Sequence, residues 1–444
     1  MPVIVMRCSI CGYIHLGVID FHHCPVCKSP VELFKPDTAM DDRGNWDTKS
    51  ILMIMEMAET GHYALEGKGT TRSFLNLDDL VFLPAQIARM PLLETQEVTC
   101  NVILGKKAKK PIVARTPILN AGMSFGALSR EAKMALAKGA AMVGGVANSG
   151  EGGMLDEERH LSDNITLQYS TGRFGISDER LQMADMIEIK ISQGAKPGMG
   201  GKLPGAKVTE EIALIRQITP GQMAASPARH PDISSPRELS DKINHLRSIT
   251  HGSPIAVKLV GGHIQKDLTA LFGQPHIPDV LVVDGAEGGT GAAPIFTKDH
   301  VGLPLIYTLS KAALFLRKNK LQDQVTLIAT GGLRHGLDAA KAIALGADAV
   351  YMGGALKIAL GCRYIRECHK GTCPFGIATQ DPNLRTRLNV EKKAVQVANF
   401  IQAATGEIKA IARICGKHNI HEMDQNDLIS LTPEMARITG VNLA

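Results

Sequence analysis

The sequence predicts an α/β protein centred on a (β/α)8 TIM barrel, with a small metal-binding domain before it and helices after it. The main observation is a rhythm that begins near residue 110, where short apolar runs end in glycine-rich turns and stretches rich in Ala, Leu and Lys follow. The runs are PILNAGMSFG, GGVANSGEGG, MIEIKI, PIAVKLVGG, VLVVDGAEGG, VTLIATGG and AVYMGG. About eight such repeats in roughly 260 residues suit a closed barrel better than an open sheet.

Length and composition set the limits for this prediction. The 444 residues allow one large domain with smaller attachments, and 44% hydrophobic residues suffice for its core. Aromatic residues make up only 4%, and basic and acidic residues are interspersed at a net charge of +5, so nucleic acid is not an expected partner. No apolar run is long enough for a membrane helix, and no signal-peptide layout is visible, so we expect a cytoplasmic protein without a membrane partner.

Four cysteines near the N-terminus form two CxxC pairs. Cys8 and Cys11 are the first pair, and Cys24 and Cys27 are the second, with twelve residues between the pairs. Each pair can place two thiolates on one metal ion, and a short ribbon between them closes a tetrahedral site. Without a secretory signal, this spacing favours metal binding over disulfides. Iron and structural zinc both suit four sulfur ligands, so both stay open.

We divide the chain into four segments. They are residues 1–35, the metal-binding domain; 36–105, a connector with a helical N-terminal extension; 106–380, the barrel; and 381–444, a C-terminal helical extension. Within them we expect a buried helix over residues 50–59, partly helical structure over 78–93 and an insertion over 193–227. A long amphipathic pattern over 392–414 and a shorter one over 430–438 predict helices that pack against the barrel.

Glycine-rich turns after the last predicted strands indicate a phosphate pocket. TGGLRHG follows the seventh strand and GGALK the eighth, so backbone amides and a helix N-terminus are free to face an anion. In barrels these two loops commonly bind phosphate, which makes FMN the first candidate cofactor. A third turn, EGGTGA, adds to the pattern, although turns that only require positive φ are the alternative. The candidate residues are Gly331, Gly332, Arg334, Gly353 and Gly354, together with Glu287, Gly288, Gly289, Thr290 and Gly291.

Six motifs together resemble one known family. MSFGALS, NSGEGG, QGAKPGMGGKLPGAKV, SPARHPDI, EGGTGA and TGGLRHG are similar to the FMN-binding synthase domain of glutamate synthases. GCRYIRECHKGTCPFGIATQ resembles that family's 3Fe–4S ligand loop, which implies Cys362, Cys368 and Cys373 as ligands. A 4Fe–4S cluster with an outside ligand and a zinc ion are the alternatives. The N-terminal CGY and CPVCKSP resemble the rubredoxin-like domain of rubrerythrins, which implies one iron ion there.

The resemblance also implies roles for single residues. Lys258 would lie under the flavin and stabilise the negative charge of its reduced form, unless it is a buried lysine paired with an acid. The resemblance places Met123, Ser124, Phe125, Gly126 and Ser149 at the flavin. A dicarboxylate needs fixed cations and amide donors, and Arg216 alone would by default be a surface ion pair. The implied substrate and catalytic residues are Glu151, Gln193, Lys196, Lys202 and Arg216, with Lys196 and Arg216 in or just after the third-strand loop.

Some positions depart from the family pattern. Lys202 replaces the usual Gln of GGQLPG, and Arg229 and Pro231 replace Pro and His in SPPPHHDI. We expect no glutaminase domain in this chain, and because Pro2 follows Met1 we also expect no N-terminal cysteine nucleophile. The resemblance implies reduction of 2-iminoglutarate, formed from 2-oxoglutarate and ammonia, to glutamate. An N-methylglutamate synthase-like enzyme, a reductase of another small anion, and an electron-transfer subunit are the alternatives.

The expected partners follow from the same reading. The substrate is a small anion like 2-oxoglutarate. Electrons come from a ferredoxin or an NAD(P)H-dependent reductase subunit, because no GxGxxG fingerprint follows a strand in this sequence. A separate glutaminase subunit and a homo-oligomer are further expectations.

Overall fold

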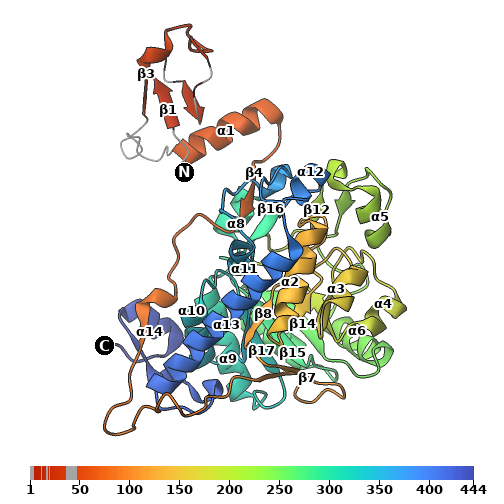
Figure 1. The fold of residues 1–444 in the computed structure, drawn as a ribbon, viewed down its shortest axis with the longest axis vertical. Coiled ribbons are helices and arrows are strands. Elements are labelled where there is room, and N and C mark those ends of the chain that lie inside the picture. Colours follow the sequence, from red (N-terminus) through yellow and green to blue (C-terminus); the bar gives the residue numbers. More distant parts are fainter. Residues whose placement is uncertain (1–4, 12, 17–18, 20, 37–47) are drawn as a thin grey trace. The chain divides into compact units, whose positions relative to one another are not determined.

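The computed structural model describes residues 5–11, 13–16, 19, 21–36 and 48–444. Contacts divide the chain into two units, Met1–Ala64 and Leu65–Ala444, whose elements Figure 1 labels. The predicted connector over residues 36–105 spans this division. Among the described helices, none is long and apolar enough to cross a membrane.

The first unit carries a small antiparallel sheet with the strand order β2-β1-β3. Its elements are β1 (Val5–Cys8), β2 (Ile14–Leu16), the 3-10 turn η1 (Val31–Leu33), β3 (Phe34–Pro36) and α1 (Thr48–Thr60). The expected helix over 50–59 is present as α1, but Ile54, Met55 and Met57 are exposed. The expectation of a buried helix was wrong, because the core of this unit gathers around its cysteines and Phe34 and does not include α1.

The second unit contains the predicted barrel. Its eight strands are β8 (Ile118–Asn120), β9 (Ala147–Asn148), β10 (Ile165–Tyr169), β11 (Met186–Lys190), β14 (Ile255–Val260), β15 (Val280–Asp284), β17 (Thr326–Thr330) and β18 (Ala349–Met352). All neighbouring strands are parallel, in the order β8-β18-β17-β15-β14-β11-β10-β9. The two ends of the sheet meet where Asn120 N donates to Val146 O at 3.1 Å. The barrel prediction is confirmed.

Helices surround the barrel and extend beyond it. They are α2 (Arg130–Met142), α3 (Asp156–His160), α4 (Asp178–Met183), α5 (Glu210–Arg216), α6 (Pro236–Ile249), α7 (Ile264–Phe272), α8 (Ile295–His300), α9 (Leu305–Lys318), α10 (Gly336–Ala344), α11 (Gly354–Ala359), α12 (Pro382–Arg385), α13 (Val390–Ile414) and α14 (Pro433–Thr439). Helix α13 confirms the long amphipathic pattern, and it packs closely on α2 (Figure 1). A Cβ atom on Gly139 of α2 would lie 2.7 Å from Val397 Cγ1, so glycine permits this approach.

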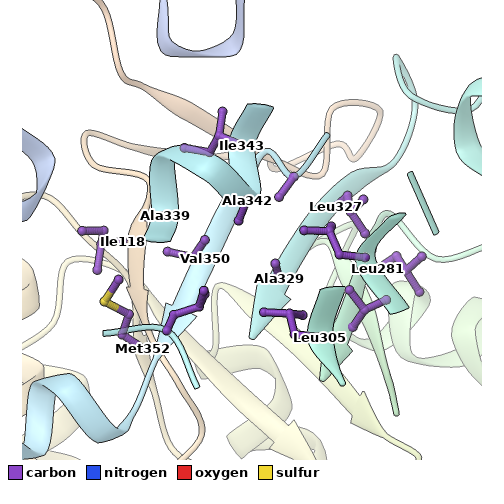
Figure 2. Close-up of a cluster of buried hydrophobic side chains, with 14 of the residues drawn as sticks. Ile118, Leu281, Leu305, Leu327, Ala329, Ala339, Ala342, Ile343, Val350 and Met352 are labelled. Carbon is purple, nitrogen blue, oxygen red and sulfur yellow. The ribbon is translucent and has the colours of Figure 1, made fainter. Parts of the chain in front are cut away.

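Two apolar layers hold the barrel together. Outside the sheet, Leu281, Leu327 and Ala329 face the helices α9 and α10, as Figure 2 shows. Inside, a second cluster joins barrel residues to an antiparallel hairpin, β6 (Val102–Leu104) with β7 (Ile112–Ala114). This apolar packing fills the barrel interior next to the hairpin, so polar groups gather near the carboxyl ends of the strands.

Three further strand pairs lie outside the barrel. They are β4 (Leu65–Lys68) with β16 (Thr290–Pro294), β12 (Lys202–Leu203) with β13 (Ala224–Ala225), and β5 (Leu80–Phe82) with β19 (Leu428–Ser430). The partly helical structure expected over 78–93 was wrong. That stretch has one 3-10 turn, η2 (Leu77–Asp79), before β5, because β5 pairs with β19 and two prolines follow at 84 and 91.

One barrel strand was missed in the sequence. Strand β10 alternates Thr166 and Gln168 with apolar residues, which weakens its apolar signal, yet all five of its residues are buried. Counting β10 makes β11 the fourth barrel strand. Lys196 and Arg216 therefore follow the fourth strand, not the third as expected.

Candidate active site

Two adjoining cavities open at the carboxyl ends of the barrel strands. The deep cavity, about 520 Å³ in volume, is lined by Lys258 and by the glycine turns after β17 and β18. The cysteine cavity is lined by Cys362, Cys368 and Cys373. The cavities share wall residues, among them Lys68, Met123, Lys190, Gln193 and Lys357. A ligand in one cavity would thus lie beside a ligand in the other.

Glycine turns form part of the rim of the deep cavity. Gly331 and Gly332 have φ values of +116° and +75°, which glycine adopts without strain. A Cβ atom on Gly331 would lie 2.7 Å from Gly285 N, whereas one on Gly354 would meet nothing within 4 Å. These turns precede α10 and α11, so they lie near two helix N-termini.

A buried ion pair lies on the wall of the deep cavity. Lys258 Nζ is 3.0 Å from Asp284 Oδ2, and both side chains are 7% exposed. Burial alone would lower the pKa of Lys258, but the carboxylates of Asp284 and Glu188 outweigh it and raise the pKa. The sequence left two alternatives open, a lysine at the flavin and a buried lysine paired with an acid. In the structure Lys258 is paired with Asp284 and also lines the deep cavity. It keeps its charge while facing the cavity.

Lys190 organises the wall between the two cavities. The sheet register places it opposite Lys258 on the neighbouring strand. Its Nζ donates to Glu151 Oε2 at 2.7 Å and to Gln193 Oε1 at 2.5 Å. Burial would raise the pKa of Glu151, but Lys190 and Lys196 lower it to about 2. Glu151 is therefore an anion at neutral pH, and two of the predicted residues share one lysine.

A smaller hollow, lined mostly by cationic side chains among its charged residues, adjoins the cysteine cavity, and Glu151 lines both. Burial lowers the pKa of Lys196 to about 8, although Glu151 opposes this shift. Arg216 is buried, and its Nη2 donates to Phe125 O at 2.7 Å. Lys202 lies at the exposed edge. We call this hollow the cationic hollow, and its charged lining residues are Glu151, Lys196, Lys202, Lys207 and Arg216.

Two lysines from neighbouring elements line the cysteine cavity, Lys68 at the end of β4 and Lys357 in α11. Lys68 Nζ donates to Cys362 Sγ at 3.0 Å. Burial and the charge of Lys68 lower the pKa of Lys357 to about 8, and the thiolates of Cys368 and Cys362 oppose this shift. Both lysines are also wall residues of the deep cavity. An anionic group held by the three cysteines would balance the positive charges of Lys68 and Lys357.

The N-terminal cysteines converge as the CxxC spacing predicts. The sulfur atoms of Cys8, Cys11, Cys24 and Cys27 all lie within 4.8 Å of one another. Cys8 and Cys27 are 3.7 Å apart, and Cys11 and Cys24 are 3.6 Å apart. This geometry fits a rubredoxin-like site with one metal ion.

Most of the site residues predicted in the barrel line these cavities, but three do not. Phe125, Gly126 and Ser149 are buried beneath the walls, where Ser149 Oγ accepts from Gln168 N at 3.1 Å. Arg334 reaches the rim but is held by Asp78 and Asp338. Residues that the sequence reading missed are Lys68, Gln168, Lys190, Asp284 and Lys357. Lys190 could have been found from the sequence, because it ends a strand of the barrel. No local sequence pattern points to Lys68.

Comparison with known proteins agrees with this architecture. The family model described as a conserved region in glutamate synthase matches residues 64–418. The glutamate synthase large subunit-like protein of Rhizobium meliloti is 40% identical over 428 residues, which cover 92% of this chain and 96% of that protein. The archaeal glutamate synthase [NADPH] of Methanocaldococcus jannaschii is 38% identical over 86% of this chain and 80% of that protein. The glutamate synthase [NADPH] large chain of Azospirillum brasilense is 33% identical, and the aligned region is 30% of its length.

Solved structures share the fold at lower similarity. A lactate oxidase from Pediococcus acidilactici superimposes with a TM-score of 0.51 at 15% identity, over 80% of this chain and 84% of that one. A mandelate oxidase variant gives a TM-score of 0.50 over 80% of this chain and 91% of that one. At such identity the likeness concerns the barrel alone. The family match and the relatives that align over most of their length show that this chain belongs to the glutamate synthase family of oxidoreductases.

Proposed function

We propose that the chain reduces 2-iminoglutarate, formed from 2-oxoglutarate and ammonia, to glutamate, with FMN in the deep cavity and iron at both cysteine groups. The observation that carries this proposal is the shared wall between the deep cavity and the cysteine cavity. FMN bound in the deep cavity would lie next to an iron–sulfur cluster bound by the three cysteines. Such proximity suits electron transfer from one to the other.

The lining of the deep cavity supports FMN as its ligand. The glycine turns at Gly331, Gly332 and Gly354 line this cavity and would face a phosphate there, and Lys258 places a positive charge on the wall. When bound, FMN supplies the hydride for a C=N bond. Lys258 would favour the negative charge of the reduced cofactor.

The cationic hollow supports a small dicarboxylate as the substrate. Lys196 and Arg216 offer fixed positive charge, and Lys190 orients the Gln193 amide. Hydride addition to an imine carbon also requires a proton on nitrogen. Glu151 cannot supply it at neutral pH, because its pKa is about 2. Lys196, with a pKa of about 8, is the better proton donor.

A second candidate is an N-methylglutamate synthase-like enzyme or a reductase of another small anion. The hollow favours it by one feature, since Lys202 and Lys207 add cations beyond those that two carboxylates need. A donor protein, a separate glutaminase and a homo-oligomer remain part of the proposal. A purely electron-transferring subunit would have no use for the cationic hollow.

The test starts from the full chain purified without oxygen. Its flavin, iron and sulfide are measured, and the reduced protein is mixed with a panel of oxo acids with and without ammonia. We expect flavin reoxidation by 2-oxoglutarate with ammonia and not by either alone. Lys196→Met should slow it strongly, whereas Lys318→Met, at an exposed lysine of α9 that lines none of the cavities, should not. Reoxidation only by another oxo acid would favour the second candidate, and no response to any would overturn both enzymatic proposals.

A further inference from the structure

Lys68 is a buried lysine in a strand outside the barrel. It ends β4, which pairs with β16 at the mouth of the barrel, and only 2% of its surface is exposed. Among the described residues, no carboxylate lies within ion-pair distance of its Nζ. Its Nζ instead donates to Cys362 Sγ at 3.0 Å and lies 4.6 Å from the centre of the Tyr364 ring. A buried charge without a counter-charge is costly, so this position requires an anion nearby.

The backbone at Lys68 is strained. Its φ value is +74°, in the left-handed region that L-residues other than Asn and Asp rarely adopt. Such strain persists where the surroundings impose it. Here the neighbouring residues hold the chain closely, because Gly67 N donates to Arg366 O at 3.2 Å. The fold therefore keeps the ammonium group against the cysteine loop at a cost.

Lys68 also stands between the two cavities. It lines both of them, as does Lys357. Hydrogen bonds to cluster sulfurs and nearby positive charge both make a cluster easier to reduce. Both lysines are therefore already placed where their charge would affect electron transfer between the two cavities.

We propose that Lys68, assisted by Lys357, is a redox-tuning residue that raises the reduction potential of the centre held by Cys362, Cys368 and Cys373. This inference rests on the proposed function, since it needs a cluster in the cysteine loop. The ammonium group of Lys68 stabilises the reduced, more negative cluster through the hydrogen bond to Cys362. The cluster then accepts an electron more readily than three thiolates alone would allow.

The test compares Lys68→Met, Lys68→Arg and Lys207→Met with the unchanged full chain in redox titrations followed by electron paramagnetic resonance. Lys207 is a matched control, because its Nζ donates to the Cys368 backbone oxygen at 3.0 Å and not to sulfur. At a fixed potential we expect Lys68→Met to lower the ratio of reduced to oxidised cluster about tenfold, or about 59 mV for one electron. Lys68→Arg should keep the ratio, and Lys207→Met should change it less.

Sulfide analysis separates the outcomes. A fully loaded Lys68→Met with an unchanged potential overturns the inference, and so does an equal shift in Lys207→Met. Loss of sulfide in Lys68→Met but not in Lys68→Arg would assign Lys68 to cluster assembly and also overturn it. Absence of sulfide from the unchanged protein would instead overturn the iron–sulfur relay in the proposed function.

Discussion

The two cysteine groups, both of which we propose to bind metal, are built in different ways. The N-terminal group brings four sulfur atoms within 4.8 Å of one another, inside a unit whose core is formed by the cysteines themselves and a few aromatic residues. The cysteine loop is built into the mouth of the barrel, next to Lys68 and Lys357. The first group can hold one ion without help, whereas the second depends on the strands and charges around it.

The first prediction tests this independence at the N-terminal group. Cys24→Ala should remove its metal ion and unfold the first unit, because metal binding supplies the stability that so small a core lacks. The barrel should keep its cofactors. Metal analysis and the visible spectrum measure the loss: a rubredoxin-type spectrum should disappear, and a colourless site with persistent zinc would contradict iron. Loss of flavin as well would show that the two groups are not independent.

The second prediction concerns the cysteine loop. Cys368→Ser should abolish acid-labile sulfide while FMN stays bound, because the glycine turns are separate from the loop. The matched control is Cys100→Ser, a buried cysteine that donates to Arg115 O at 3.3 Å and belongs to neither group. Sulfide and flavin content are measured together. Full sulfide in Cys368→Ser would remove this residue from the proposed ligands.

The difference also explains what the sequence could predict. The CxxC pairs predicted the N-terminal site, because ligands close in sequence meet at a turn. The repeats from residue 110 predicted the barrel, since each strand carries its own local signal. Strand β10 was not predicted because its buried polar residues Thr166 and Gln168 interrupt the apolar pattern that marks the other strands. Lys68 was not predicted as a site residue because its contact with Cys362 joins positions 294 residues apart, and no local sequence pattern indicates such a contact.

The third prediction tests how far the loop depends on neighbouring strands. A Cβ atom on Gly67 would lie 2.8 Å from Arg366 O and 3.1 Å from Cys368 N. Gly67→Ala should therefore displace the loop, cost about 1–3 kcal/mol and reduce sulfide retention. Gly406→Ala is the control, because a Cβ atom there meets nothing within 4 Å. Thermal unfolding and sulfide content report the effect, and normal retention in Gly67→Ala would make the loop as self-sufficient as the N-terminal group.

The last prediction concerns substrate binding. Of the two cysteine groups, only the cysteine loop should change its spectroscopic signal when substrate binds. Cys368 lines the cationic hollow together with Lys196, so an anion bound there should perturb the signal of the loop cluster. Lys196 is charged below its pKa of about 8 and neutral above it, because burial disfavours the charge. Affinity for 2-oxoglutarate should thus be constant below pH 8 and fall up to tenfold per pH unit above it.

Titrations of the cluster signal with 2-oxoglutarate at pH 7 and pH 9 measure this change. Lys196→Arg should keep the affinity constant over that range, since guanidinium stays protonated. The N-terminal spectrum should not change with 2-oxoglutarate at either pH. An equal response from both cysteine groups, or a pH dependence that persists in Lys196→Arg, would contradict the assignment. The titration therefore separates a cysteine group that shares a cavity with the substrate from one that holds its metal alone.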